Sequence, residues 1–343
     1  MLVYHASALG VIGEDTALFS RIAHLAVIVF FVISGYAVAS SLDRHNDVTK
    51  FLSARFSRVY SIAIPALFFA LTLDLIVGVN NNLGYPEWQY RQWWAFIGLS
   101  LTFLGESWTM MHRPFSIIPY WSLAYEFWYY VLIAAFTFKN EKLRFLLCAL
   151  ALAFAGPKII LLLPCWLLGI WLYKYRDANL QPSYRLNYFA AIAIFLGLMA
   201  LYINSGVDLA LQAFSKQLCN QSILGQVSAK CGYSKWFIAD YPVALIFAAI
   251  SALVMFKSDY QKSWVSKLAP HTFGVYLLHY PLLIAASTVF KPPHSIAFSI
   301  IVITSVFAAT VALSILFDKA RPHLAKVFQQ LLSKLFRISP TTN

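Results

Sequence analysis

Residues 23–42 read AHLAVIVFFVISGYAVASSL and contain no Asp, Glu, Lys or Arg. Such a run forms a membrane-spanning α-helix, because about 20 apolar residues cross the roughly 30 Å hydrocarbon core of a bilayer. Similar runs recur along the chain at Tyr60 to Val79, Ile118 to Phe138, Leu143 to Gly156, Ile159 to Tyr173, Tyr188 to Ile203, Phe237 to Phe256, Thr272 to Phe290 and Ile296 to Phe317. The sequence therefore predicts an all-α integral membrane protein.

The composition agrees with a membrane protein and excludes several other classes. Of the 343 residues, 60% are hydrophobic and 12% are charged, and the mean hydropathy is +0.67. Soluble globular proteins carry about 25% charged residues, so a water-soluble enzyme, a disordered chain and a disulfide scaffold are excluded. The net charge of +12 comes from Lys and Arg in short clusters between apolar runs, which indicates control of topology rather than nucleic-acid binding.

Two short segments decide the predicted topology. Met1 to Ile12 is too short to cross a bilayer, and so is Trp93 to Leu104, which we interpret as a re-entrant or interfacial segment. With that assignment, the basic loops around Arg44 and Lys142 and the C-terminal tail share one side, which holds most of the 26 Lys and Arg residues. Basic loops mark the cytoplasmic side. We expect about ten transmembrane helices in the plasma (inner) membrane, with both termini cytoplasmic.

The predicted organisation is one transmembrane domain over 1–317 and a basic amphipathic tail over 318–343. In the tail, Lys326 to Arg337 places apolar side chains on one helical stripe beside basic ones, which predicts a helix on the inner membrane surface. The chain opens without a basic n-region or a small-residue cleavage site, so we expect no removed signal peptide.

Two of the four cysteines, Cys219 and Cys231, share the predicted outward loop Asn204 to Trp236. That loop faces an oxidising compartment, so a disulfide between them is one interpretation. Two unpaired thiols are the other.

Four ionisable residues lie at membrane depth: His5, Asp74, Glu126 and His279. A charge there costs at least about 2.5 to 3.5 kcal/mol, which marks each of them as a candidate for function. By helix rise, His5 and Glu126 lie roughly 12 Å below the outer boundary and His279 lies roughly 16 Å below it. We therefore expect two imidazoles and a carboxylate to meet in one buried cavity.

The two strongest candidates also have structural interpretations. His5 can act as a general base, because imidazole titrates near neutrality, or it can hydrogen-bond a neighbouring helix. Glu126 can take part in chemistry, or it can anchor a polar helix contact with Ser122 and Tyr130, which lie four residues away on the same face.

Arg55 and Arg58 are neighbours on one helix face, near the predicted start of their helix. Guanidinium groups beside a helix N-terminus suit a phosphate-bearing ligand. The alternative is control of topology together with contact to anionic lipid.

Five motifs follow in order along nearly the whole chain: Tyr4-His5, residues 30–36 (FFVISGY), residues 51–60 (FLSARFSRVY), residues 120–129 (YWSLAYEFWY) and Tyr276-Leu277-Leu278-His279. Together they resemble the membrane-bound acyltransferase 3 family, in its stand-alone form without a soluble C-terminal domain. The sequence has no CxxC, HExxH, Gly-rich phosphate loop or GxSxG motif, so zinc, nucleotide-hydrolysis and serine-hydrolase chemistry have no support.

The resemblance implies an O-acyltransferase that moves an acyl group, usually acetyl from acetyl-CoA, to a hydroxyl of a carbohydrate or another cell-envelope acceptor. His5 matches the family's essential histidine and Glu126 matches the acid of its WSLxxE-like motif, which makes both catalytic candidates. Arg55 and Arg58 match its RxxR motif and would bind acyl-CoA. The expected cavity-lining residues are Ser34, Trp121, Ser122 and His279. Acyl-CoA is then a donor substrate, and neither a bound cofactor nor a metal is expected.

The start of the chain departs from the family, which has an Arg upstream of the position of His5 in a longer first helix. This leaves two interpretations, a start assigned too late or a truncated and impaired copy.

The aromatic and polar segment Asn80 to Pro119 is the expected acceptor platform. Two other functions stay open: a transporter or flippase of a sugar or lipid-linked substrate, and a catalytically inactive scaffold. Within the enzyme interpretation, His5 acts as a base or becomes acylated itself.

Overall fold

The computed structural model describes residues 1–12, 16–45, 47–78, 87–177, 187–221, 229–254, 269–290 and 295–337. Within these ranges the regular elements are all helices, so the predicted all-α class is confirmed. In chain order they are α1 (Leu2–Ala8), α2 (Thr16–His45), α3 (Val48–Val77), α5 (Glu87–Arg91), α6 (Trp93–Leu101), α7 (Tyr120–Phe136), α8 (Glu141–Ala155), α9 (Pro157–Leu161), α10 (Leu163–Asp177), α11 (Tyr188–Asn204), α12 (Val207–Gln221), η1 (Ala229–Ser234), α14 (Phe237–Val254), η2 (Ala269–His271), α16 (Thr272–Val289), α17 (Ile296–Asp318) and α18 (Arg321–Arg337).

Several of these helices are suited to a bilayer. Five spans in the described chain are long and apolar enough to cross a membrane, and they correspond to α2, α3, α14, α16 with η2, and α17. A further pair, α11 and α12, is bent by 64° at its junction and together has the length of one more span. The protein is therefore a multi-pass membrane protein. The predicted number of about ten helices and the cytoplasmic placement of both termini stay predictions.

The start of α3 differs from its prediction. The expected span began at Tyr60, whereas the helix begins at Val48, because Asp47 caps it by accepting hydrogen bonds from the backbone N–H groups of Thr49 (2.7 Å) and Lys50 (3.1 Å). Arg55 and Arg58 consequently lie inside the helix, two or more turns from its first residue. The expectation that they sit at a helix N-terminus is wrong.

The tightest helix crossing in the core is between α2 and α10. A Cβ atom at Gly35 would overlap the backbone carbonyl of Trp166, and one at Gly169 would overlap the backbone of Val32. Only glycine at both positions lets the two backbones approach so closely. This close approach at Gly35 also fixes the height of the adjacent Ser34 in the bundle.

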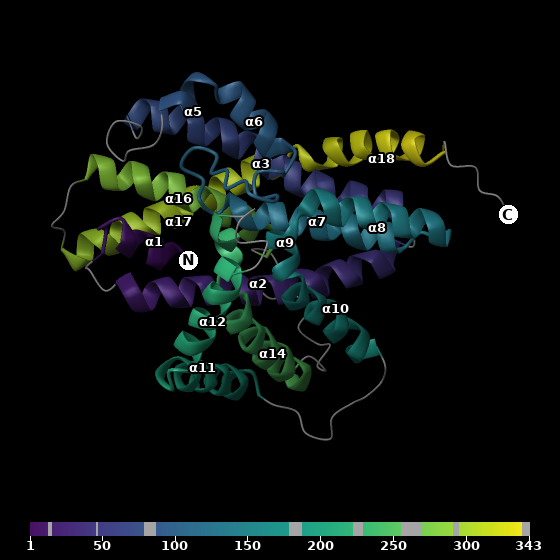
Figure 1. Ribbon diagram of the computed structural model, residues 1–343. Helices are drawn as coiled ribbons and strands as arrows, with labels where there is room; N and C mark the ends of the chain where they lie inside the picture. Colours follow the sequence, from purple (N-terminus) through teal and green to yellow (C-terminus); the bar gives the residue numbers. More distant parts are fainter. Residues whose placement is uncertain are drawn as a thin grey trace.

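Figure 1 shows α2 in the middle of the molecule, with α5 and α6 at the top of the view and α11 at the bottom. The nine residues of α6 are too few to cross a bilayer, as predicted for Trp93 to Leu104. Residues 80–86 of the expected acceptor platform, and residues 338–343 of the tail, lie outside the described ranges.

The segment between α6 and α7 is held in a strained shape by buried anchors. Phe103, Trp108 and Phe115 have φ values of 55°, 51° and 52°, which non-glycine residues rarely adopt. Phe103 and Phe115 are fully buried. Asp74 on α3 accepts hydrogen bonds from the backbone N–H of Ser116 (2.9 Å) and the hydroxyl of Tyr90 (3.1 Å). Asp74, a functional candidate by depth alone, therefore anchors this segment.

Two smaller expectations are confirmed. Cys219 and Cys231 are joined by a disulfide, which links α12 to η1. The basic tail forms the helix α18, which packs against α3 through Phe328, whose ring lies 5.8 Å from Phe56 and 5.3 Å from Tyr60. Its position on a membrane surface stays a prediction.

Candidate active site

The two imidazoles singled out from the sequence lie against each other. His5 on α1 and His279 on α16 have ring centroids 5.2 Å apart, and Tyr280 meets the His5 ring edge-on at 4.6 Å. Only 7% of His5 and 2% of His279 is exposed. The short helix α1 packs against both α2 and α16, which places His5 at the junction of these three helices.

The hydrogen bond of His279 determines which of its ring nitrogens is basic. Its Nδ1 lies 3.2 Å from the carbonyl oxygen of Val275, one turn earlier on α16. A ring nitrogen that faces a carbonyl oxygen carries the proton, so in the neutral ring Nε2 holds the lone pair. Nε2 is buried and has no hydrogen-bond partner among the described residues. The pair therefore presents a buried acceptor nitrogen to any group that enters.

Glu126 belongs to a neighbouring polar cluster. Its carboxylate accepts short hydrogen bonds from the hydroxyls of Ser34 on α2 and Tyr130 on α7. The indole N–H of Trp166 donates to the Ser34 hydroxyl at 3.3 Å, which fixes the orientation of that serine. Glu126 is not among the residues that line the cavity beside His5. The two imidazoles therefore meet as expected, but each lines a different cavity and Glu126 lines neither, so the expectation of one cavity shared by all three residues is wrong.

Tyr276, which was not among the predicted site residues, lies between the two clusters. The hydroxyls of Tyr276 and Ser122 are 2.9 Å apart, and the Tyr276 ring lies 6.0 Å from that of His279. Ser122 precedes Glu126 by one turn on the same face of α7. Polar groups thus continue from His279 through Tyr276 and Ser122 toward Glu126.

Arg55 lies on the opposite side of the Glu126 cluster from the imidazoles. Its guanidinium carbon is 5.8 Å from the ring centre of Tyr130, and its Nη2 donates to the carbonyl oxygen of Ala37 at 3.1 Å. The side chain is only 8% exposed, and its Nε has no hydrogen-bond partner among the described residues. Such burial is unlike the surface contact expected of an arginine that binds lipid headgroups. Arg58, half-buried, lies one turn further along the same helix face.

Two cavities flank the histidine pair. One of about 270 Å³ lies beside His5, and its wall includes His24, Arg113, Trp121, Tyr233, Lys235 and Trp236. The other, of about 200 Å³, lies beside His279 among mostly apolar side chains of α16 and α17. Of the predicted lining residues, Trp121 and His279 do line these cavities. Ser34 and Ser122 do not, because both hydroxyls are buried in the hydrogen bonds described above.

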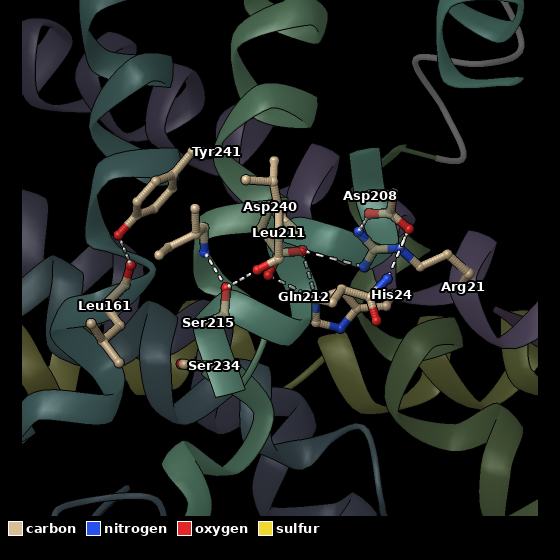
Figure 2. Close-up of polar contacts among 12 residues, drawn as sticks. Arg21, His24, Leu161, Asp208, Leu211, Gln212, Ser215, Ser234, Asp240 and Tyr241 are labelled. Carbon is tan, nitrogen blue, oxygen red and sulfur yellow. Dashed lines mark hydrogen bonds and ion pairs between the residues drawn. The ribbon is translucent and has the colours of Figure 1, made fainter. Parts of the chain in front are cut away.

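A charged network supports the wall of the larger cavity (Figure 2). Arg21 on α2 pairs with Asp208 on α12 and with Asp240 on α14, and Asp240 also accepts from His24 Nε2 at 2.9 Å. Gln212 donates to Asp208 at 2.8 Å. The sequence did not predict this network, because α12 lies in the segment Asn204 to Trp236 that was expected to be a loop. The pairing of α2 with α12 and α14 positions His24 at the cavity.

A second buried ion pair joins Lys158 on α9 to Glu106 in the segment between α6 and α7. Lys158 Nζ is 3.7 Å from the carboxylate of Glu106, and each side chain is 2% exposed. Lys158 also donates to the carbonyl oxygen of Met110. Burial raises the pKa of Glu106 to about 7, with Lys158 and Arg113 acting in the opposite direction. The pair fixes the strained segment that carries Arg113.

The described residues contain no group of three or more His, Cys, Asp or Glu side chains that could hold a metal ion. In comparison with known proteins, a family model described as an acyltransferase domain matches residues 1–319, which is most of the chain. No curated protein and no solved structure matches it.

Proposed function

The chain belongs to this acyltransferase family, and we propose that it transfers an acyl group, acetyl in the simplest form, from acyl-CoA to a hydroxyl of a carbohydrate or another cell-envelope acceptor. The observation that carries the proposal is the buried contact between His5 and His279, with a cavity on either side. An imidazole at a cavity wall is in reach of both an acceptor hydroxyl and a thioester. This is the arrangement that general-base transfer requires.

In the proposed step, His5 takes the proton of the acceptor hydroxyl while the oxygen attacks the thioester carbon. The carbon–sulfur bond then breaks, the acyl group stays on the acceptor as an ester, and the imidazolium returns its proton to the thiolate of CoA. Tyr280, which packs edge-on against His5, fixes the plane of the imidazole. His279 lines the apolar cavity, which suits the acyl group.

The donor enters from the side of Arg55 and Arg58. A buried guanidinium with an unpaired Nε is a binding group for a phosphate oxygen, and Glu126 with Tyr130 holds it in place between turnovers. Along α2, Val27 lines the cavity beside His5 and Ala37 contacts Arg55. Ten residues of helix correspond to about 15 Å, so the pantetheine arm has to extend by that distance from the arginines to His5.

The test is a transfer assay on the full chain in lipid nanodiscs, with radiolabelled acetyl-CoA and a panel of glycans. Label in the glycan that is released as acetate by mild alkali supports O-acyl transfer. Label must disappear in His5→Ala and persist in His323→Ala, a control on the exposed face of α18.

Two results would overturn the proposal. Glycan movement across proteoliposomes without labelled product would indicate the transporter or flippase alternative. Binding of acetyl-CoA with neither transfer nor flux, across the whole panel, would indicate an inactive scaffold.

A further inference from the structure

The mouth of the cavity beside His5 is rich in positive charge. Arg113 and Lys235 both line it. The guanidinium carbon of Arg113 lies 5.7 Å from the ring centre of Tyr233, and Lys235 Nζ lies 4.6 Å from that of Trp236. A third cation, Lys216 on α12, approaches the same Trp236 ring at 5.9 Å. Three basic side chains from three different segments therefore gather at one opening.

These cations influence one another. The pKa of Lys235 is lowered by burial first, and then by the positive charges of Lys216 and Arg113. Positive charges this close to one another repel, which raises the free energy of the protein without ligand. An anion bound among them reduces this repulsion.

The neighbouring carboxylates of the described chain already have basic partners of their own. Asp208 pairs with Arg21, Asp240 pairs with Arg21 and His24, and Glu106 pairs with Lys158. Arg113 and Lys235 form no ion pair of this kind among the described residues. Their charge is therefore available to a ligand in the cavity.

The other walls of the cavity are aromatic. Trp121 and Tyr233 stack with their centroids 4.4 Å apart and their planes 5° from parallel, and the rings of Trp236 and Tyr280 line the same space. Flat aromatic surfaces with a few convergent polar groups are typical of ligand sites, and they suit the apolar C–H face of a sugar ring.

We propose that the acceptor is an anionic saccharide, whose carboxylate or phosphate binds Arg113 and Lys235 while its ring packs against the aromatic wall of the cavity and one hydroxyl reaches His5. This inference rests on the proposed function for the meaning of "acceptor", but the binding site itself does not require turnover. Arg113 comes from the strained segment between α6 and α7, and Lys235 precedes α14. Both positions belong to the face that the charge pattern predicts to be outward.

The experiment measures saccharide binding by the full chain in nanodiscs of uncharged lipid, through the fluorescence of its tryptophans. The first pair of probes is trigalacturonic acid and the neutral galactose trisaccharide with the same linkages. The second pair is mannose 6-phosphate and mannose, which separates a phosphate from a carboxylate. We expect the anionic member of at least one pair to bind about tenfold to a hundredfold more tightly, the ratio typical of a hydrogen bond to a charged group.

The variants test whether these two residues carry the preference. Lys235→Gln and Arg113→Gln should each remove most of it, whereas Lys235→Arg should keep it because the charge remains. Lys142→Gln, an exposed lysine on α8 at the predicted inner side, is the matched control and should change nothing. Raising the salt concentration should weaken only the anionic probes.

Equal binding of both members of each pair, or a preference that survives both glutamine variants, overturns the inference. So does the absence of binding by all four probes. A failure of the proposed function is seen separately, as loss of His5-dependent acetyl transfer, and leaves the binding ratios unaffected.

Discussion

The imidazole rings of His5 and His279 lie 5.2 Å apart, although one belongs to the first helix and the other to α16. The contact joins the two cavities of the site, since His5 lines the larger one and His279 the smaller. The smaller cavity is mostly apolar, and the larger one is charged and aromatic, so under the proposed function the acyl group would occupy the first and the acceptor the second. The proposed transfer would then require both cavities to be occupied at the same time.

The first prediction concerns His5. Replacing His5 by Ala should lower the rate of acetyl transfer by about 10² to 10⁴, the usual contribution of a general base. The measurement is label transfer by the purified variant in nanodiscs, with thermal unfolding as the check on folding. Turnover near that of the wild type would assign the base to another residue, and His279→Ala would then be the variant to measure.

A second prediction separates the role of Arg55 in binding from one in topology. Arg55→Ala should raise the KM for acetyl-CoA by about tenfold to a hundredfold, because a hydrogen bond to a charged group contributes about 1.5 to 3 kcal/mol. Arg55→Lys should recover only part of this, since lysine cannot form two parallel hydrogen bonds. Arg144→Ala, which removes a half-buried arginine on α8 that pairs with Glu141, is the control. An unchanged KM for acetyl-CoA in Arg55→Ala would show that Arg55 does not bind the donor and would favour a role in membrane topology.

Apolar runs in the sequence were sufficient to predict the helical membrane fold. A helix that spans a bilayer must be long and hydrophobic, and both properties can be counted directly in the sequence. Helix ends were less predictable. The capping carboxylate of Asp47 moves the start of α3 well before Tyr60, and the polar helix α12 lacks the apolar run that would have identified it. Capping and tertiary packing decide these ends, and neither is a property of a hydrophobic run.

Depth in the membrane predicted part of the site. His5 and His279 do meet, but Glu126, placed at a similar depth, faces Ser34 instead. Helix rise fixes the height of a residue and leaves its direction around the helix axis undetermined. The cationic cavity could not be predicted for the same reason, since Arg113 and Lys235 are far apart in the sequence and are brought together only by packing.

A third prediction addresses the crossing of α2 and α10. Gly35→Ala should lower the free energy of unfolding by about 1 to 3 kcal/mol, because a methyl group there would overlap the carbonyl of Trp166. Gly197→Ala on α11 is the matched control, since its Cβ would meet nothing within 4 Å and alanine favours a helix by about 0.5 to 1 kcal/mol over glycine. Chemical unfolding of both variants in detergent compares them. A stable Gly35→Ala protein would mean that the two helices can separate at no cost.

The disulfide supports a fourth prediction. Cys219 and Cys231 are 12 residues apart, so their bond should stabilise the region of α12 and η1 by about 2 to 4 kcal/mol. Without reductant, alkylation followed by mass spectrometry should leave both thiols unmodified. Reduction should lower the unfolding temperature of the wild type and should leave a Cys219→Ser/Cys231→Ser variant unchanged. Alkylation of both residues before reduction would show that the bond does not form in the purified protein.

The last prediction is a pH dependence of stability that originates at Glu106. Burial raises the pKa of this carboxyl from 4.5 to about 7 in the folded protein. Between these two values the unfolded chain has lost the proton and the folded chain still holds it, so the unfolded state binds fewer protons. Stability therefore falls as the pH rises from 4.5 to about 7, and it levels off above that range. Glu106→Gln should remove this slope, because an amide does not titrate in this range, and the loss of the negative partner of Lys158 is felt only above about pH 7, where Glu106 is ionised. Glu141→Gln, at an exposed position on α8, should keep the wild-type slope. Unfolding midpoints of the three proteins across this pH range decide the matter, and a slope that persists in Glu106→Gln would place its origin in another carboxyl group.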